Sequence, residues 1–177
     1  MTPDLPKNRA HPLEGIERED IQITDIKVTL LSYRLKPEEQ WADGDENVVI
    51  WKTTTVLIEI FTDVGIVGIG GSSRYKGPEK MKEYVEKVIK PILIGKNPFD
   101  VEFLSGGLTG HGGRGAWAGV DIALWDIIGK AKGLPVYKLL ATDVEPETRL
   151  RVYASGGEFS WRRDSPFDGP ESLIEKA

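Results

Sequence analysis

The stretch from Gly115 to Lys132 has the longest run of helical periodicity in the sequence. Its apolar side chains recur every three or four residues, the spacing that gathers them on one face of an α-helix. Gly133 and Pro135 follow directly, and both residue types end helices. A helix this apolar has to bury that face, so the rest of the chain must supply a second layer. The periodic positions are Ala116, Val120, Ala123, Leu124, Ile127, Ile128 and Ala131.

Three segments rich in β-forming residues precede this helix and predict a three-stranded antiparallel meander. In the first, the alternation of apolar and polar side chains changes parity near Thr24 and Asp25, which indicates a bulge or a late start. A polar loop is expected over residues 36–47, and Gly65 can take the positive φ of the tight turn before the last strand. The predicted strands are residues 22–33, 48–61 and 66–70.

Shorter helices are predicted between the strands and the long helix. Pro78 has the fixed φ that suits a first helical position, and apolar residues then recur at helical spacing in a helix that ends around Pro91. Asn97 and Pro98 repeat this start signal and predict a short helix through Leu104. The remaining segments are a glycine-rich hinge over 106–115 and a short helical turn over 136–140.

Strands followed by helices predict one α+β domain over residues 21–147. Residues 1–20 contain three prolines among charged side chains and are expected to form a flexible tail. From residue 148 the pattern changes, because 148–154 reads as a new strand and a helix is expected to begin near Pro170. Residues 148–177 are therefore predicted to be one strand and one helix of a different architecture.

Composition removes several classes of function. The 177 residues contain no cysteine and two histidines, which excludes disulfides, thiolate nucleophiles and multi-histidine metal centres. A net charge of −5 without blocks of like charge favours neither nucleic acid nor an anionic membrane as a partner. No apolar run approaches the roughly 18 residues of a membrane span. A cytoplasmic location is expected.

Local motifs give few chemical signals. The glycines of 110–115 match G-x-G-x-x-G, but a helix rather than a strand is predicted before them, which favours a hinge over nucleotide binding. The acidic loop 43–46 is expected to stay hydrated rather than bind a metal. Residues 72–76 put hydroxyls, a phenol and two cations on one loop, a set suited to an anionic ligand or to an exposed polar turn. Asp126 and Lys130 are spaced to form an ion pair along the long helix.

The segment Ala116–Leu140, AWAGVDIALWDIIGKAKGLPVYKLL, closely resembles the helix and turn that close the capping domain of the mandelate racemase/muconate lactonizing enzyme family of the enolase superfamily. The order of the predicted elements from residue 21 agrees with that family. Residues 95–100, GKNPFD, and Arg151–Gly157, RVYASGG, extend the resemblance, and the second of these resembles the family's first barrel strand.

The resemblance implies a capping domain that works with an incomplete TIM-like barrel. In the family, barrel residues hold Mg²⁺, and a Lys or His base removes the proton beside a substrate carboxylate to give a metal-stabilised enediolate. The loops 34–47 and 71–77 would face the substrate, which makes Trp41, Arg74 and Tyr75 the candidate substrate-binding residues. The implied substrate is a small carboxylate such as an acid sugar. Dehydration is the first expectation for the reaction, followed by racemisation, epimerisation and cycloisomerisation.

The largest departure from the family is the length of the segment that resembles its barrel. Only 29 residues run from Arg149 to Ala177, whereas a complete barrel takes about 250. No catalytic residue and no metal ligand of the family can therefore be placed on this chain, and Mg²⁺ is implied only for a full-length member. The leading hypothesis is a truncated, amino-terminal part of such an enzyme. The alternatives are a non-catalytic capping or dimerisation module, and one half of a split enzyme whose barrel comes from a partner chain. A homo-oligomer is also compatible with the sequence.

Overall fold

A computed structural model describes residues 8–42, 49–72, 77–101, 104, 113–142 and 145–152. The chain divides into two compact units. The first comprises Met1–Leu31 and Thr55–Glu147, and the second comprises Ser32–Thr54 and Thr148–Ala177. The first unit contains the hydrophobic core and the helices. No helix within the described ranges is long and apolar enough to cross a membrane.

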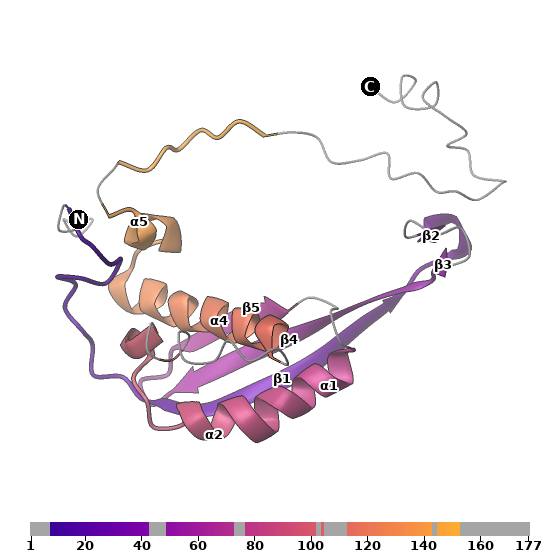
Figure 1. Cartoon of the computed structure of the whole chain (residues 1–177), viewed down its shortest axis with the longest axis horizontal. Helices are drawn as coiled ribbons and strands as arrows, with labels where there is room; N and C mark the ends of the chain where they lie inside the picture. Colours follow the sequence, from indigo (N-terminus) through magenta and orange to yellow (C-terminus); the bar gives the residue numbers. More distant parts are fainter. Residues whose placement is uncertain are drawn as a thin grey trace. The chain divides into compact units, whose positions relative to one another are not determined.

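The predicted meander is confirmed. Strands β1 (Ile23–Arg34), β4 (Lys52–Thr62) and β5 (Val67–Ser72) form an antiparallel sheet in the order β1-β4-β5 (Figure 1). The turn between β4 and β5 places Gly65 at φ 80°, and the register pairs Phe61 with Val67 and Val56 with Ser72. The alternation in β5 continues two residues beyond its predicted end, because Ser72 still pairs with β4 and is buried.

The parity change in β1 is also confirmed. Ile23 and Ile26 are both buried although three positions separate them, and Thr24 and Asp25 between them are exposed. The main chain of Ile23 pairs outside the sheet, since its N–H donates to Lys96 O at 2.9 Å and its carbonyl accepts from Gly95 N at 2.8 Å. The start of β1 is therefore anchored by the loop that follows the first helices.

The first helical segment runs without a break from Pro78 to Leu93. It consists of α1 (Pro78–Tyr84), a π-helical turn η2 (Val85–Ile89) and α2 (Lys90–Leu93). The sequence predicted an end around Pro91, and this is wrong by two residues. Proline has no N–H and its ring crowds the carbonyl four residues earlier. The wider π turn, in which Lys90 N–H donates to Val85 O, precedes the proline and lets the helix continue past it.

The remaining helices are η3 (Pro98–Asp100), α4 (Arg114–Lys132) and α5 (Val136–Leu140). Asn97 caps η3 as predicted, since its Oδ1 accepts from Phe99 N at 2.9 Å. The predicted helix through Leu104 begins as this 3₁₀ turn, and much of its remainder lies outside the described residues. The same holds for most of the predicted glycine-rich hinge. Gly133 ends α4 in the left-handed region at φ 63°, as its position predicted.

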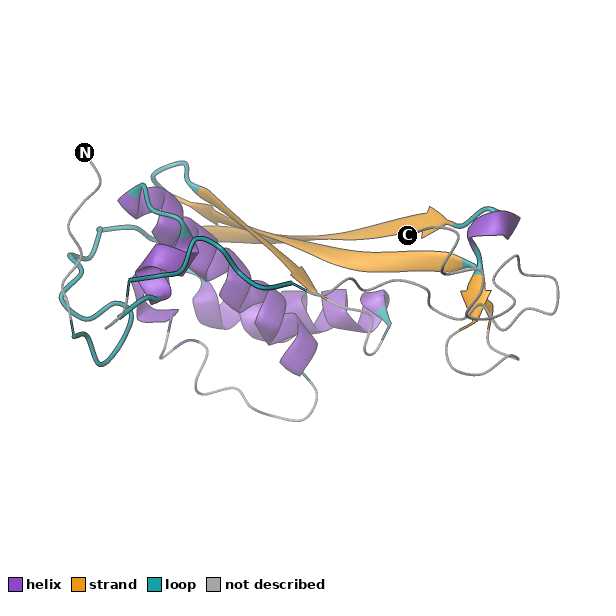
Figure 2. Ribbon diagram, turned by 90° about the horizontal axis from the view of Figure 1, so that it is seen from above, coloured by secondary structure: helices purple, strands orange, loops and turns teal. Residues whose placement is uncertain are grey.

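The helices cover one face of the sheet in the first unit (Figure 2). All seven predicted apolar positions of α4 lie in or against the core. Contact with β5 is close because Gly68 and Gly70 have no side chains, so that the main chain of α4 at Ala123 and Gly119 approaches the strand directly. The largest fully buried side chains are Ile23, Ile26, Val56, Ile58, Ile60, Ile89, Leu93, Leu104, Leu124, Ile127, Ile128 and Leu139.

Helix α4 also covers the outer edge of β5. Asp126 Oδ2 accepts from Ile69 N at 2.8 Å, and Lys130 Nζ donates to Val67 O at 2.7 Å. The predicted ion pair between Asp126 and Lys130 is present at 2.7 Å. These two side chains satisfy main-chain groups that an edge strand would otherwise present for pairing with another chain.

Two segments differ from their predicted states. Leu13 and Ile16, assigned by sequence to the flexible tail, pack against the core of the first unit. Residues 148–152, assigned to a strand, form none, and Leu150 and Val152 are 75% and 85% exposed. A strand requires a neighbour for its N–H and carbonyl groups, and the described residues offer none here. The rest of the predicted strand and the helix from Pro170 lie outside the described residues.

Candidate functional site

The segment between β1 and β4 was predicted to be an irregular loop over 36–47, and the structure corrects this. It contains the 3₁₀ turn η1 (Pro37–Glu39) and a two-stranded ladder of β2 (Trp41–Ala42) with β3 (Val49–Ile50). Trp41 pairs with Ile50, and Leu35 N–H donates to Trp51 O at 2.9 Å. Aromatic and β-branched residues on both sides favour the ladder over an open loop.

Trp51 lies between β3 and β4, and two cationic side chains lie over its ring. The guanidinium carbon of Arg34 lies 5.8 Å from the ring centroid, and Lys52 Nζ lies 5.3 Å from it. The indole is half exposed. Both distances fall within the range of cation–π attraction. Neither cation has an acidic partner among the described residues, so Arg34, Trp51 and Lys52 form an exposed, positively charged aromatic cluster. The name tip cluster is used for these three residues.

Glu39 organises the turn beside this cluster. Its Oε2 accepts from Lys36 N at 2.9 Å and from the Tyr33 hydroxyl at 3.3 Å. The negative charge of Glu39 raises the pKa of Tyr33 above its ordinary value. The ordinary pKa of a tyrosine phenol already lies well above physiological pH, so Tyr33 stays neutral there and its exposed hydroxyl can donate a hydrogen bond.

The predicted substrate-binding residues are only partly described. Trp41 lies in β2 by its main chain, while its side chain is outside the described set. Arg74 and Tyr75 fall in 73–76, which is also outside it. Ser72, at the start of the predicted anion loop, is buried and donates from Oγ to Gly115 O at 2.5 Å. Its hydroxyl therefore fastens β5 to α4 and is not offered to a ligand.

Sequence reasoning missed the tip cluster. The sequence pattern places Arg34 at the start of the expected substrate-facing loop 34–47, and Trp51 with Lys52 in the interior of a long strand. A meander nevertheless brings the end of one strand beside the start of the next. That pairing is the signal that would have placed the three side chains together.

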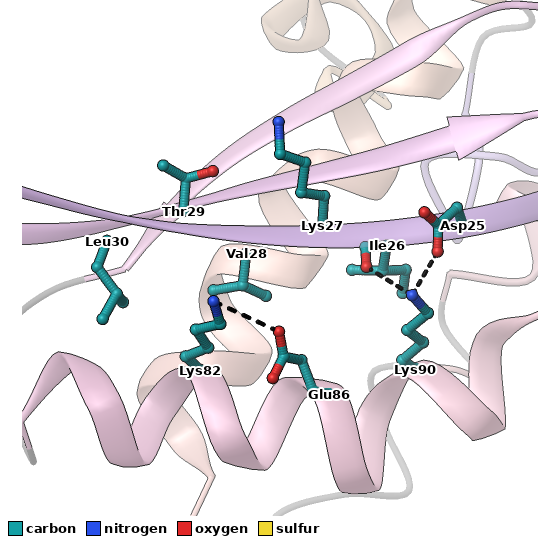
Figure 3. Close-up of a pocket in the computed structure, with 9 residues that line it drawn as sticks. All are labelled: Asp25, Ile26, Lys27, Val28, Thr29, Leu30, Lys82, Glu86 and Lys90. Atoms are coloured by element: carbon teal, nitrogen blue, oxygen red, sulfur yellow. Dashed lines mark hydrogen bonds and ion pairs between the residues drawn. The ribbon is translucent and has the colours of Figure 1, made fainter.

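A groove of about 540 Å³ runs between β1 and the helix α1–α2 (Figure 3). Its charged groups satisfy one another. Lys90 pairs with Asp25 and donates to Ile26 O at 3.1 Å, and Lys82 Nζ lies 3.7 Å from Glu86. The hydrogen bond from Lys90 lowers the pKa of Asp25. The groove is therefore a structural seam between strand and helix, with no unpaired group suited to chemistry among its lining residues.

A metal site requires several ligating side chains close together. Within the described ranges no three His, Cys, Asp or Glu side chains are grouped closely enough to hold a metal ion. The described residues thus do not fit the Mg²⁺ site that the family resemblance implies for a barrel, and no catalytic step is assigned to them.

The fold is that of an α+β capping domain, and its second compact unit carries the exposed aromatic and cationic tip cluster. The sequence model of the mandelate racemase / muconate lactonizing enzyme N-terminal domain matches residues 48–141, more than half of the chain. The chain belongs to this family of the enolase superfamily.

The relatives include an arabinonate dehydratase and members of the D-galactonate dehydratase family. Arabinonate dehydratase of Saccharolobus solfataricus is 32% identical over 80% of this chain and 39% of its own length. A D-galactonate dehydratase family member of a Paenibacillus species is 38% identical over 49% of this chain and 23% of its own length. This chain therefore spans well under half of the relatives it matches.

Solved structures agree on the fold. The dipeptide epimerase of Enterococcus faecalis, crystallised with Mg and the dipeptide L-Leu-L-Tyr, superposes with a TM-score of 0.59 at 26% identity. That match covers 67% of this chain and 34% of the epimerase.

Proposed function

We propose that this chain supplies the capping domain of an acid-sugar dehydratase, with a tip that binds the substrate and restricts which acid sugar is accepted. The reaction class is proton removal beside a carboxylate followed by loss of water. In a full-length member, barrel residues would hold Mg²⁺, which would supply electrostatic stabilisation of developing negative charge. The proposal is supported by the acid-sugar dehydratases among the relatives.

The observation that carries the proposal is the tip cluster. An acid sugar presents a carboxylate, a row of hydroxyls and a face of C–H groups. Arg34 offers a planar fork of N–H donors and Lys52 a point charge, and both suit anionic or hydroxyl oxygens. The half-exposed indole of Trp51 offers a flat surface for the C–H face of the sugar. A ligand of this class would also screen the repulsion between the two cations.

The candidates from sequence stay predictions beside the tip cluster. Trp41 pairs with Ile50 in the ladder that precedes Trp51, whereas Arg74 and Tyr75 come from the second loop that the family resemblance assigns to the substrate. Arg74 would contribute a further cation and Tyr75 a hydroxyl. In this arrangement the capping domain binds and orients the substrate and keeps water out, while proton transfer belongs to barrel residues.

Ligand binding at the tip can be measured directly on the chain. Indole ¹H–¹⁵N resonances are recorded while arabinonate or galactonate is added, and Trp51→Phe identifies the Trp51 signal. We expect the Trp51 resonance to shift with the acid sugars and to stay in place with galactose, which has no carboxylate. The double variant Arg34→Ala/Lys52→Ala should abolish the shift.

Lys27→Ala is the matched control, because Lys27 is an exposed cation on β1 whose partner is Glu59 rather than Trp51. It should leave the titration unchanged. Equal shifts with galactose and galactonate would contradict recognition of the carboxylate. The reaction is tested separately, in a protein that joins this domain to a family barrel, by following loss of water from acid sugars with Mg²⁺. Racemisation without loss of water would contradict the dehydratase assignment.

A further inference from the structure

Arg9 is the only charged residue that is buried within the described ranges, at 5% exposure. Burying a guanidinium is costly unless its N–H groups are hydrogen-bonded. No carboxylate among the described residues meets it. Its hydrogen bonds go to main-chain carbonyls instead, and two of these carbonyls lie more than a hundred residues away in the sequence.

The acceptors lie at the end of α5. Nη2 of Arg9 donates to Leu139 O at 3.1 Å and to Ala141 O at 2.5 Å, while Nη1 donates to Pro12 O. The main-chain N–H of Arg9 lies 3.4 Å from Thr142 O. Carbonyls at a helix C-terminus lack partners within the helix and carry partial negative charge, so a cation is favoured there.

Helix α5 depends on such support. It has five residues, and an isolated helix of this length is unstable in water. At its ends, Pro135 O accepts from Lys138 N at 3.0 Å and from Leu139 N at 3.4 Å, and Ala141 N donates to Tyr137 O at 3.2 Å. The segment from Arg9 to Ile16 adds apolar contacts to the core through Leu13 and Ile16.

We propose that residues 9–16 form a strap that holds the end of α5, and that Arg9 is the positioning residue that fixes the course of the chain where it leaves α5 at Ala141 and Thr142. A planar guanidinium can reach several carbonyls at once. A lysine ammonium at the same place has one nitrogen and cannot reproduce that fork. Loss of the guanidinium would leave the carbonyls of α5 without their cation and let its last turn open.

Hydrogen exchange of the main-chain amides tests the strap in the full chain. In Arg9→Ala we expect protection of the Leu139 and Ala141 amides to fall by about tenfold or more, since charge-assisted hydrogen bonds are lost. Amides in the middle of α4, such as that of Leu124, should keep their protection. Arg18→Ala is the control, because Arg18 lies nine positions further along the same segment and forms an exposed ion pair with Asp100 at 2.6 Å.

Arg9→Lys keeps the positive charge and provides a second test in case the alanine variant unfolds as a whole. In Arg9→Lys the amides of α5 should also lose protection selectively, and the loss should be smaller than in Arg9→Ala. The proposal is overturned if α5 amides are as well protected in Arg9→Ala as in Arg18→Ala, or exchange freely in the unaltered chain. It is equally overturned if Arg9→Lys weakens α4 and α5 alike, since Arg9 would then contribute only to general stability.

Discussion

Replacing Gly70 by alanine should be among the most damaging small changes in the first unit. A Cβ atom at this position would overlap the carbonyl oxygen of Gly119 in α4, and it would lie 2.9 Å from the carbonyl carbon of Gly119 and 3.0 Å from Ala123 N. All of these are main-chain atoms, so no change of rotamer can relieve the overlap. The helix has to move away from the strand.

The cost can be worked out from what that movement loosens. Ordinary van der Waals contact begins at 3.4 Å, which requires Gly119 O of α4 to withdraw by about 1.6 Å, and a gap of this size forfeits about half of a dispersion contact or more. Three large buried side chains of α4, each contributing about 2 kcal/mol, would lose about 3 kcal/mol in total. Lengthening the hydrogen bonds of Asp126 and Lys130 to β5 adds about 1 kcal/mol. We therefore expect the free energy of unfolding to fall by about 4 kcal/mol, just above the usual range for overpacking.

Urea unfolding followed by circular dichroism measures this loss, and a thermal scan should show a decrease in Tm of about 8–16 °C for a chain of this length. Gly71→Ala is the control, because a Cβ at the next residue of the same strand meets nothing within 4 Å. Gly119→Ala should rank between them, since its Cβ would lie 2.9 Å from the side-chain atom Ile58 Cδ1 and 3.0 Å from Gly71 O, with no overlap as severe as at Gly70. A Gly70→Ala protein within about 1 kcal/mol of Gly71→Ala would refute the close packing of α4 on β5.

Three further expectations concern capping and titration. Asn97→Ala should cost about 1–2 kcal/mol in urea unfolding and Asn97→Asp less, because aspartate keeps the capping oxygen and loses only the amide donor. Lys90→Met should raise the pKa of Asp25, which NMR titration measures. Because folding lowers that pKa, the ion pair stabilises the protein at pH values above the ordinary carboxyl range. This stabilisation is lost as the pH falls through the pKa of the folded state. Glu39→Gln should lower the pKa of Tyr33 in an ultraviolet titration, because the raised value comes mainly from the charge of Glu39.

Much of the fold could be predicted because single residue types act locally. The parity change at Thr24 and Asp25, the cap at Asn97 and the left-handed Gly133 each follow from the chemistry of one or two side chains. The apolar spacing of α4 likewise requires only that one face of the helix be buried. These features can therefore be predicted from short stretches of sequence without knowledge of the full topology.

Predictions failed where the answer depends on a distant partner. Arg9 stands among prolines and charges, and nothing near it in the sequence indicates carbonyl acceptors at Leu139 and Ala141. Residues 148–152 have the composition of a strand and no described neighbour to pair with. The tip cluster forms only because the end of β1 lies beside the start of β4. The composition of either strand alone does not show that Arg34 meets Trp51 and Lys52.

The segment whose sequence identifies the family is centred on α4, and its described side chains have structural roles. In α4, Gly119 admits the close approach of β5, Asp126 and Lys130 cover the edge of that strand, and the apolar face fills the core. Each task is fixed by packing or main-chain hydrogen bonding and would be the same for any substrate. Resemblance in this segment therefore establishes fold and family without selecting a reaction. Discrimination between substrates needs exposed side chains whose exchange leaves the core intact, and among the described residues the tip cluster has that character.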